Sequence, residues 1–290
     1  MGFIRFFSVI LAAFLFFACT NKNSMQKNIN EKINIEENDT LKILNENSNE
    51  DSNFSSLLSV VLTNAGLPQR ISLKIQEGIA ANPSFIIDIF SILQDDPYLW
   101  ILVDKEHSLS QNYEPDDLVE LTNRSYRVNR AGMFLRRAAE ESLEEMANNA
   151  RNDGITLTAS SAYRSYNYQV QVYDRNVREE GQEEADRVSA RPGHSQHQLG
   201  LVVDFGSITD GFAQTAEGRW IAANASRFGW SLSYPDGYEE ITGYRWESWH
   251  YRYTGVVLAE FIDTYFDGIQ HYALKFLHEY HKESIKQGTQ

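Results

Sequence analysis

The chain has 290 residues, of which 42% are hydrophobic and 23% charged, ordinary values for one sizeable globular domain with extensions. Its formal net charge of −14 argues against a nucleic-acid-binding protein, because such proteins usually carry a basic surface. With a single cysteine, no disulfide can form within the chain, so its stability must come from sources other than disulfides.

The N-terminal segment resembles a secretory signal. Residues 1–18 contain an early Arg5 and then a run rich in Phe, Leu, Ile and Ala, as in signals removed from mature proteins. Ala18 directly before Cys19 is similar to a bacterial lipobox, which would make Cys19 the lipidated first residue and a membrane anchor. An uncleaved membrane anchor is the alternative, because the apolar run is borderline for spanning a bilayer. Both interpretations place the chain outside the cytoplasm, in the cell envelope.

Two segments precede the main domain. Residues 19–56 follow the signal and are rich in Asn, Lys, Glu and Ser, which predicts a disordered tether because little apolar area is available to offset the ordering entropy. Residues 57–98 carry apolar side chains at helical spacing, and Pro83 stands near the first turn of a second apolar run. We expect two helices here, packed on the main domain or forming a small cap.

The main domain is expected over residues 99–285 as a mixture of strands and helices. Apolar runs and alternating patterns predict strands, whereas apolar stripes at helical spacing predict helices. The expected strands cover residues 99–103, 155–161, 199–205 and 244–251. The expected helices cover residues 130–149, 166–180, 215–228 and 254–280, with a glycine stop at Gly154 and a loop over 187–196.

Two of these segments carry residues that can bind a metal. His197 and Asp204 lie in a turn-rich loop that runs into an apolar strand, and Glu247 and His250 lie in the last predicted strand. Zinc in hydrolases often has three ligands drawn from histidines and carboxylates, leaving a fourth position for water. From spacing alone, a surface histidine and an aspartate that caps a turn remain equally open interpretations.

Strand geometry constrains how these residues can meet. Side chains alternate along a strand, so the seven-residue separation of His197 and Asp204 would place them on opposite faces of a straight strand. They converge if His197 precedes the strand and Gly200 permits a tight bend. Glu247 and His250 have the same parity problem, so one of them should lie at a strand end or bend.

Several separated motifs, in the same order, resemble the zinc D,D-carboxypeptidases of the VanY type, within the wider family of D-Ala-D-Ala dipeptidases and carboxypeptidases. The resemblance spans about residues 99–253. Its motifs are Leu102–Lys105, Pro115–Leu118, Tyr163–Tyr166 with Gln169, then Ser195, His197, Gly200 and Asp204, and finally Glu247, Trp249 and His250.

The resemblance implies a zinc site and its base. His197, Asp204 and His250 would ligate zinc, and Glu247 would be the general base that takes a proton from the zinc-bound water and passes it to the leaving amine. This division is chemically reasonable, because zinc lowers the pKa of water and polarises a carbonyl, while a neighbouring carboxylate moves the proton.

Three further positions receive substrate roles from the same resemblance. Arg164 would stabilise the developing oxyanion, with a structural ion pair as its alternative role. Gln169 and Ser195 match positions that contact the terminal carboxylate and the peptide, although a helix-surface amide and a loop cap are alternatives.

The remaining histidines receive no such role. The resemblance gives none to His194. A cluster on the final predicted helix, His271, His278 and His281, lies near one face and could bind a metal, but without a nearby carboxylate motif it is better interpreted as a solvated helix face.

The sequence therefore predicts an exported zinc D,D-carboxypeptidase that removes the terminal D-Ala from peptidoglycan stem peptides. The resemblance implies an α+β fold, with a small, mostly antiparallel sheet flanked by helices, the zinc site on the open sheet face and an N-terminal helical extension. One alternative is an L,D-carboxypeptidase acting on tetrapeptide stems. Another is a catalytically inactive cell-wall-binding lipoprotein, which the presence of Glu247 disfavours because a binding module needs no base. A serine nucleophile is disfavoured because no matching Ser-x-x-Lys set occurs.

Overall fold

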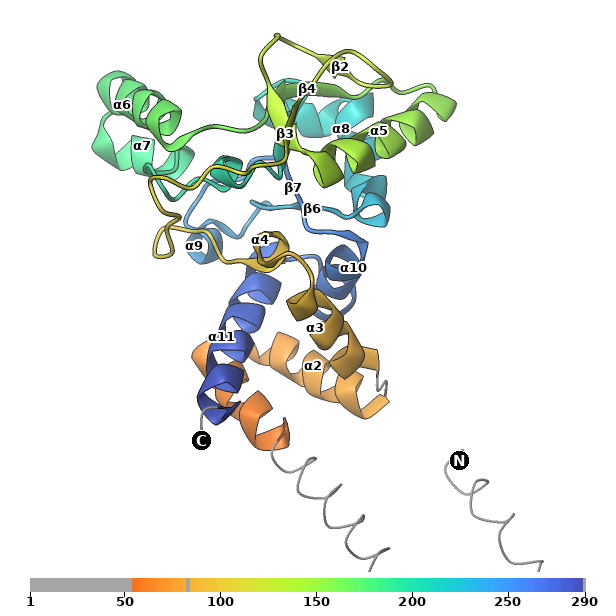
Figure 1. Cartoon of the computed structure of the whole chain (residues 1–290), viewed down its shortest axis with the longest axis vertical. Coiled ribbons are helices and arrows are strands. Elements are labelled where there is room, and N and C mark those ends of the chain that lie inside the picture. The colour runs from red at the N-terminus through yellow and green to blue at the C-terminus, as the bar shows by residue number, and fades with distance from the viewer. Residues whose placement is uncertain (1–53, 82–83, 289–290) are drawn as a thin grey trace, which may run out of the picture. The chain divides into compact units, whose positions relative to one another are not determined.

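The structure, a computed structural model, describes residues 54–81 and 84–288, and a five-stranded sheet lies at the centre of its main domain (Figure 1). The strand order is β2-β4-β5-β7-β6, with bounds Arg127–Val128, Thr158–Ser161, Val202–Phe205, His250–Tyr253 and Trp230–Leu232. β2 and β4 are parallel, and the other neighbouring pairs are antiparallel. A separate antiparallel pair joins β1 (Leu118–Glu120) to β3 (Phe134–Arg136). The predicted α+β fold with a small, mostly antiparallel sheet is confirmed.

Helices pack around this sheet and at one end of the molecule. Their bounds are α2 Gln69–Ala81, α3 Ser84–Gln94, α4 Pro97–Trp100, α5 Arg137–Asn152, α6 Tyr166–Glu180, α7 Gln182–Val188, α8 Ala216–Asn224, α9 Glu239–Thr242, α10 Val256–Tyr265 and α11 Gln270–Gly288. Residues 54–64 are also helical. In Figure 1, α5 and α8 lie beside the sheet, whereas α2, α3 and α11 gather at the opposite end.

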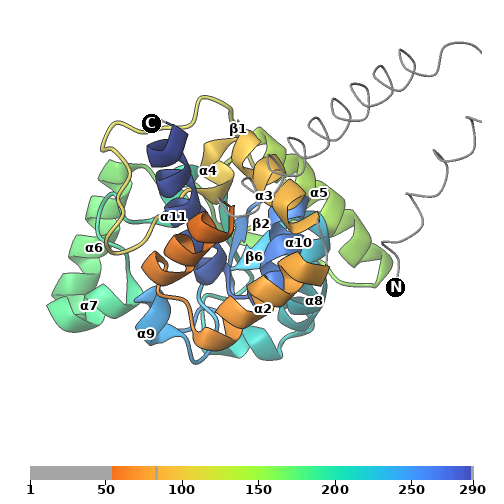
Figure 2. The ribbon, with the colours of Figure 1, turned by 90° about the horizontal axis from the view of Figure 1, so that it is seen from below.

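The N-terminal helices share a hydrophobic core with the C-terminal ones. Phe85 on α3 is fully buried, and its ring lies 5.2 Å from Phe261 and 4.7 Å from Tyr265 on α10, and 6.1 Å from Phe276 on α11. Figure 2 shows α2 and α3 lying over α10 from the other direction. The region contains three helical segments instead of the two predicted, because residues 54–64 and α2 are separate.

Residues 99–103 do not form the predicted strand. The short helix α4 starts after Asp96, whose side chain accepts a hydrogen bond from the N–H of Tyr98 at 2.9 Å. Nη2 of the buried Arg252 on β7 then donates to the carbonyls of Tyr98, Leu99 and Ile101 at 2.9, 3.1 and 3.0 Å. The backbone of this segment therefore bonds to a side chain instead of a neighbouring strand, which a short apolar run cannot reveal.

The predicted helix over 130–149 begins later than expected. Residues Phe134–Arg136 pair with β1 as β3, and α5 begins only at Arg137. Its predicted end is confirmed, because Gly154 has a φ of +76° and its N–H donates to the carbonyl of Arg151 at 2.9 Å. The helix predicted over 166–180 is confirmed as α6.

The predicted final helix over 254–280 is two helices. The chain turns at Asp267 and Gly268, which have φ values of 54° and 75°, and such values cannot continue a right-handed helix. The break allows α11 to fold back against α10, with the ring of Phe266 lying 5.6 Å from that of Phe276. The apolar pattern runs through the turn, so the break could not be predicted from the pattern.

Other boundaries differ by a few residues. The strands predicted over 155–161 and 199–205 are β4 and β5, each beginning later than predicted, whereas only residues 250–251 of the strand predicted over 244–251 belong to β7. The helix predicted over 215–228 is α8 followed by a 3₁₀ turn, and α7 enters the predicted loop over 187–196. β1, β2, β6, α7 and α9 were not predicted.

The signal segment, Cys19 and the tether lie outside the described residues. Within the described part of the chain, no helix combines the length and the apolar character needed to cross a membrane.

Candidate metal centre and substrate cleft

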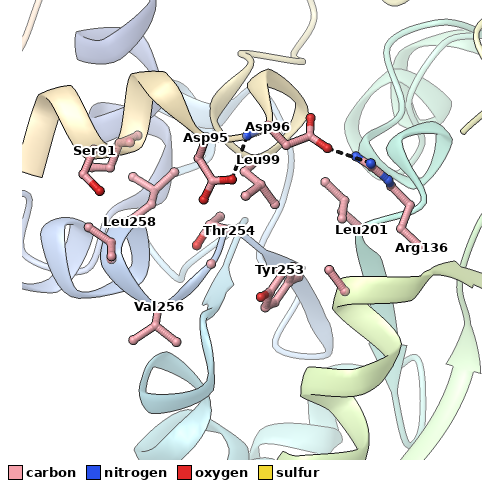
Figure 3. Close-up of a pocket in the computed structure, with 14 residues that line it drawn as sticks. Ser91, Asp95, Asp96, Leu99, Arg136, Leu201, Tyr253, Thr254, Val256 and Leu258 are labelled. Carbon is pink, nitrogen blue, oxygen red and sulfur yellow. Dashed lines mark hydrogen bonds and ion pairs between the residues drawn. The ribbon is translucent and has the colours of Figure 1, made fainter. Parts of the chain in front are cut away.

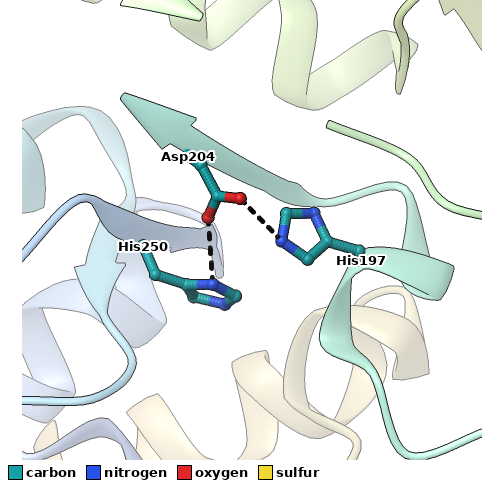
Figure 4. A group of neighbouring side chains, drawn as sticks. All are labelled: His197, Asp204 and His250. Atoms are coloured by element: carbon teal, nitrogen blue, oxygen red, sulfur yellow. Dashed lines mark ion pairs between the residues drawn. The ribbon is translucent and has the colours of Figure 1, made fainter. Parts of the chain in front are cut away.

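Two neighbouring strands and the turn before one of them bring three candidate ligands together (Figure 4). Asp204 on β5 pairs directly with His250, the first residue of β7. His197 lies in the 3₁₀ turn Gln196–Leu199 that precedes β5. The side-chain ligand atoms of the three lie within 4.8 Å of one another, and this is the one such group in the described part of the chain. All three residues are at most 4% exposed.

The bend that allows this convergence lies at Gly200. Its φ of +68° is in the left-handed region, and a Cβ there would lie 3.0 Å from side-chain atoms of Arg136 and Leu118. The predicted solution to the parity problem is therefore confirmed, since His197 precedes the strand and Gly200 turns the chain into it. Glu247 likewise precedes β7 and lies in the turn before His250.

Hydrogen bonds orient both imidazoles toward Asp204. Nδ1 of His197 lies 2.7 Å from the carbonyl oxygen of Ala162, which can only accept, so Nδ1 carries the proton and Nε2 faces Asp204 Oδ2 at 3.2 Å. Nε2 of His250 lies 3.3 Å from Gln196 Oε1, and Nδ1 faces Asp204 Oδ1 at 3.1 Å. Partners of this kind on the remote ring nitrogen are typical of histidines that ligate metals.

These residues fit a zinc ion. Asp204 Oδ1 is buried and lacks a hydrogen-bond partner of good geometry, which is costly for a carboxylate unless a cation completes its surroundings. Two imidazole nitrogens and a carboxylate oxygen are a donor set that zinc uses in hydrolases, with one position left open.

The two imidazoles differ in their electrostatic surroundings. Burial lowers the pKa of His197 to about 4, and the nearby Arg164 adds to this effect. Burial also disfavours the charged form of His250, but hydrogen bonds to Asp204 and Glu247 outweigh it and raise its pKa to about 9. Burial alone would raise the pKa of Asp204, yet the two histidines hold it well below its usual value.

Glu247 stands beside the ligands at the wall of the cleft. Its Oε2 lies 3.3 Å from Nδ1 of His250, and its side chain is 14% exposed. The carboxylate is thus next to the metal-binding atoms and in contact with solvent, as a group that exchanges protons with water must be.

Arg164 follows β4 and reaches the same centre. Its Nε and Nη2 donate to Ser161 Oγ at 3.1 and 2.8 Å, and Nη2 also donates to Asp204 Oδ2 at 2.9 Å. The ion pair considered from the sequence is therefore present. It fixes one edge of a guanidinium that also lines the cleft, so an ion pair and a role toward substrate are compatible.

The cleft has a volume of about 230 Å³ and is lined by all seven candidate site residues. Gln169 on α6 is 1% exposed, and its Nε2 donates to the carbonyl of Ala190 at 2.7 Å while Oε1 has no partner. It is not a helix-surface amide. Ser195, 3% exposed, precedes the 3₁₀ turn that carries His197 without a side-chain capping bond.

A chain of buried amides supports His250 and was missed in the sequence. Ser233 Oγ donates to Gln196 Oε1 at 2.7 Å, and Gln196 Nε2 lies 3.4 Å from Gln270 Oε1 on α11. Gln270 is held in turn by the carbonyl of Ser231 at 3.1 Å. The position of Gln196 directly before His197 was the available signal for its role, whereas nothing in the sequence linked Gln270 to the site.

The other histidines lie elsewhere. His271 is mostly buried, with Nε2 3.9 Å from Asp104 Oδ2. The ring centroids of His278 and His107 lie 4.8 Å apart in an edge-on arrangement, and those of His281 and Trp100 lie 5.1 Å apart. The prediction of a solvated helix face is confirmed for the exposed His281 and is wrong for His271 and His278, which pack on the loop around Asp104.

A further cavity of about 260 Å³ lies between α3, α4 and the start of α10 (Figure 3). Its lining includes Leu99, Leu201 and Val256, together with Asp96, which pairs with Arg136 at 2.6 Å. None of the metal-centre residues lines it, so it is separate from the cleft.

Three candidate ligands, a neighbouring carboxylate and a substrate-sized cleft define a metallohydrolase. A family model described as "VanY: D-alanyl-D-alanine carboxypeptidase" matches residues 132–256. The chain is 36% identical over 183 residues to a Bacillus subtilis (strain 168) protein named "Putative carboxypeptidase YodJ", covering 61% of this chain and 67% of that protein. It is 32% identical over 195 residues to a D-alanyl-D-alanine carboxypeptidase of Enterococcus faecalis, covering 63% and 69%.

Solved structures of carboxypeptidases also match this chain. The LdcB LD-carboxypeptidase matches with a TM-score of 0.57 and 32% identity, over 62% of this chain and 88% of that one. A zinc complex of a mutant of the vancomycin-resistance D,D-pentapeptidase VanY matches with a TM-score of 0.51 and 31% identity, over 63% and 98%. The chain belongs to the VanY family of D-alanyl-D-alanine carboxypeptidases. It is a zinc-dependent metallo-carboxypeptidase.

Proposed function

We propose that this protein is a zinc D,D-carboxypeptidase that removes the terminal D-Ala from peptidoglycan stem peptides. The observation that carries the proposal is the His197–Asp204–His250 group with Glu247 beside it in one cleft. The relative from Enterococcus faecalis, whose name gives the D-Ala-D-Ala activity, supports this choice of bond.

His197, Asp204 and His250 are the proposed zinc ligands. Bound zinc would lower the pKa of a water molecule and polarise the scissile carbonyl. The protein's own contribution begins with orientation, since Ala162 and Gln196 hold the two imidazoles with a ring nitrogen directed at Asp204.

Glu247 is the proposed general base and acid. Its carboxylate takes a proton from the attacking water as the new bond to the carbonyl carbon forms. It then returns that proton to the amine of the departing D-Ala as the peptide bond breaks. The partly exposed side chain beside His250 supports this assignment, because the same carboxylate reaches both the water and the cleft.

Arg164 is the proposed oxyanion stabiliser. Ser161 and Asp204 hold Nε and Nη2, so the cation is fixed before substrate arrives and needs no reorganisation during the reaction. Gln169 and Ser195 are proposed to contact the terminal carboxylate and the peptide. The unpartnered Oε1 of Gln169, in the cleft, supports a contact with a substrate N–H.

Cleavage of an L,D bond in tetrapeptide stems is a second candidate. It is favoured by the LdcB LD-carboxypeptidase, whose structure matches this chain with a higher TM-score than the VanY mutant. The test is incubation of the zinc-loaded protein with stem peptides ending in D-Ala-D-Ala or in a single D-Ala after an L-centre, followed by mass measurement of the products. Loss of one alanine from the first peptide alone supports the D,D activity, and loss from the second alone replaces it with the L,D activity.

An inactive cell-wall-binding lipoprotein remains the alternative from another class. It predicts no release of alanine from either peptide, together with retained binding to cell-wall fragments. The presence of Glu247 at the cleft argues against it, because binding alone does not require a base.

We also propose that the protein is exported and anchored through a lipidated Cys19 after removal of residues 1–18. Its family supports action outside the cytoplasm, where peptidoglycan lies. Metabolic labelling with a palmitate analogue should mark the native chain and leave a Cys19→Ser variant unlabelled. Absence of label from the native chain would remove the lipidation proposal and favour the uncleaved anchor, and equal labelling of both would place the lipid on another residue.

A further inference from the structure

A second cavity adjoins the catalytic cleft. It has a volume of about 280 Å³ and is lined by Lys105, Asp186, Ser189, Arg191, His194 and Tyr244. Ser189 and Tyr244 line both this cavity and the cleft, so a ligand in the cleft can extend into it. The lining carries two permanent cations against one carboxylate, in a protein whose net charge is −14.

The single carboxylate is already neutralised. Arg191 donates from Nε and Nη2 to the two oxygens of Asp186 at 2.9 Å each. The Tyr173 hydroxyl adds a hydrogen bond to Asp186 at 2.7 Å. Asp186 and Arg191 therefore satisfy each other, which leaves Lys105 as the cation available to a ligand.

Lys105 packs on Tyr244, and the carboxylate that senses its charge, Glu239, is already paired with Arg187 at 2.6 Å. The Lys105 ammonium lies 5.0 Å from the ring centroid of Tyr244, and its aliphatic stem lies against Gly243, where a Cβ would approach its Cδ to 2.8 Å. Within the described residues it forms no hydrogen bond or ion pair. An exposed ammonium without an ion-pair partner, packed on an aromatic ring in a cavity that adjoins the cleft, is suited to bind an anion.

His194 completes the wall of the cavity. Its Nδ1 lies 2.7 Å from the carbonyl oxygen of Asp104, which can only accept, so Nδ1 carries a proton. This bond fixes the loop that carries Lys105 to the loop that precedes the metal-binding turn. The cavity is thus joined to the catalytic centre by backbone structure as well as by shared lining.

We propose that Lys105 binds a free carboxylate on the stem of the substrate, at a distance from the scissile bond. The inference rests on the proposed carboxypeptidase function and adds a substrate class to it. Stem peptides contain a glutamate joined through its γ-carboxyl group, so its α-carboxyl group is either free or amidated. The enzyme therefore prefers the free-carboxylate stem.

The terminal carboxylate of the substrate is a less suitable ligand for Lys105. The catalytic cleft has its own cations, Arg164 and Arg175, and Arg175 forms no ion pair within the described residues. Lys105 lines only the adjoining cavity. A peptide that spans both spaces can therefore place its terminal carboxylate in the cleft and its stem carboxylate beside Lys105.

Binding to the zinc-loaded Glu247→Gln protein tests this without turnover. Calorimetric titration would use two pentapeptides that differ only in whether the α-carboxyl group of the glutamate is free or amidated. The free form should bind about fivefold more tightly, as for a solvent-exposed charge pair, and Lys105→Met in the same background should remove that difference. Lys282→Met removes an exposed cation from α11 and should leave the difference unchanged.

A third peptide distinguishes the two carboxylates. Amidation of the peptide's C-terminus should weaken binding by the same factor in the Glu247→Gln protein and in the protein that also carries Lys105→Met. Equal affinity for the two stems in the Lys105 protein, or a preference that survives Lys105→Met, would overturn the proposal. If Lys105→Met instead removed the effect of C-terminal amidation on affinity, Lys105 would be assigned to the terminal carboxylate. That result would also overturn the proposal. Hydrolysis by the wild-type protein tests the proposed function independently of these affinities.

Discussion

In each of two regions of the molecule, histidines surround a buried aspartate, and the two regions have different roles. Around Asp204, two imidazole nitrogens face the carboxylate at 3.1 and 3.2 Å, and within the described residues no backbone N–H donates to it. Around Asp104, Oδ1 accepts the backbone N–H groups of Glu106 and His107 at 2.8 Å each, and also faces His107 Nδ1 at 2.8 Å.

The difference lies in what each carboxylate is already bonded to. Asp104 closes a turn in its own loop, as aspartates often do, and the histidines of α11 pack against that turn. Asp204 lies on a strand whose backbone groups are used in the sheet; its Oδ2 accepts from Arg164, and its Oδ1 remains for a metal. The same residue types therefore stabilise a loop around Asp104 and form a candidate set of metal ligands around Asp204.

Removal of a proposed zinc ligand should cause the largest difference in zinc affinity between variants of the two regions. We expect His250→Ala to weaken zinc binding by more than about a hundredfold, because loss of a ligand exceeds the loss caused by removing its supporting partner. Competition with a chromophoric chelator measures the affinity. His271→Ala, which alters the Asp104 region, should bind zinc as the native chain does, and a similar loss in both variants would contradict the distinction.

Replacement of the base should separate chemistry from metal binding. Glu247→Gln keeps a side chain of the same shape but cannot accept a proton, so kcat should fall by about a hundredfold or more. The zinc content, measured by atomic absorption, should remain at one ion per chain. A Glu247→Gln protein with native turnover would end the assignment of the base.

The buried amide beside His250 should have an intermediate effect. Gln196→Ala removes the partner of His250 Nε2, and we expect a zinc affinity about tenfold weaker, as for other outer partners of metal-binding histidines. Gln198→Ala is a matched control, because that neighbouring amide bonds to the carbonyls of Ser110 and Tyr113 instead. Equal zinc affinities for the Gln196→Ala variant and the native chain would remove Gln196 from the metal centre.

The Asp104 region should affect how the free energy of unfolding depends on pH in the acid range. Burial lowers the pKa of His271 from 6.5 to about 4, so the folded state resists its protonation. The corresponding stability is complete above pH 6.5 and is lost as the pH falls toward 4, by about 2 kcal/mol at pH 5. Urea unfolding of the zinc-free native and His271→Gln proteins at pH 7.5 and pH 5 measures this, and the variant should lose less stability on acidification. An equal loss in both proteins would show that His271 is not the group responsible.

The sequence predicted which residues lie together in the candidate metal centre better than it predicted the shape of the chain around them. His197, Asp204 and His250 carry recognisable residue types at motif spacing, and Gly200 identified the necessary bend. α6 was also predicted in full, and in the structure Ser165 caps its start and Gly181 follows its end.

The errors share a physical cause, which is that long-range contacts decided the outcome. Residues 99–103 give their carbonyls to Arg252, which lies about 150 residues later in the sequence. The helix predicted over 254–280 breaks at Asp267 so that α11 can return to α10. Gln270 reaches the metal centre only through that return, so no local pattern could have assigned it.

The contact between Gln270 and Gln196 shows that the proposed metal centre depends on residues beyond those that the family model covers. A fragment limited to residues 132–256 would contain His197, Asp204 and His250 but would lack the amide that contacts Gln196. The limits of the family match are therefore narrower than the limits of the structural unit that supports His250.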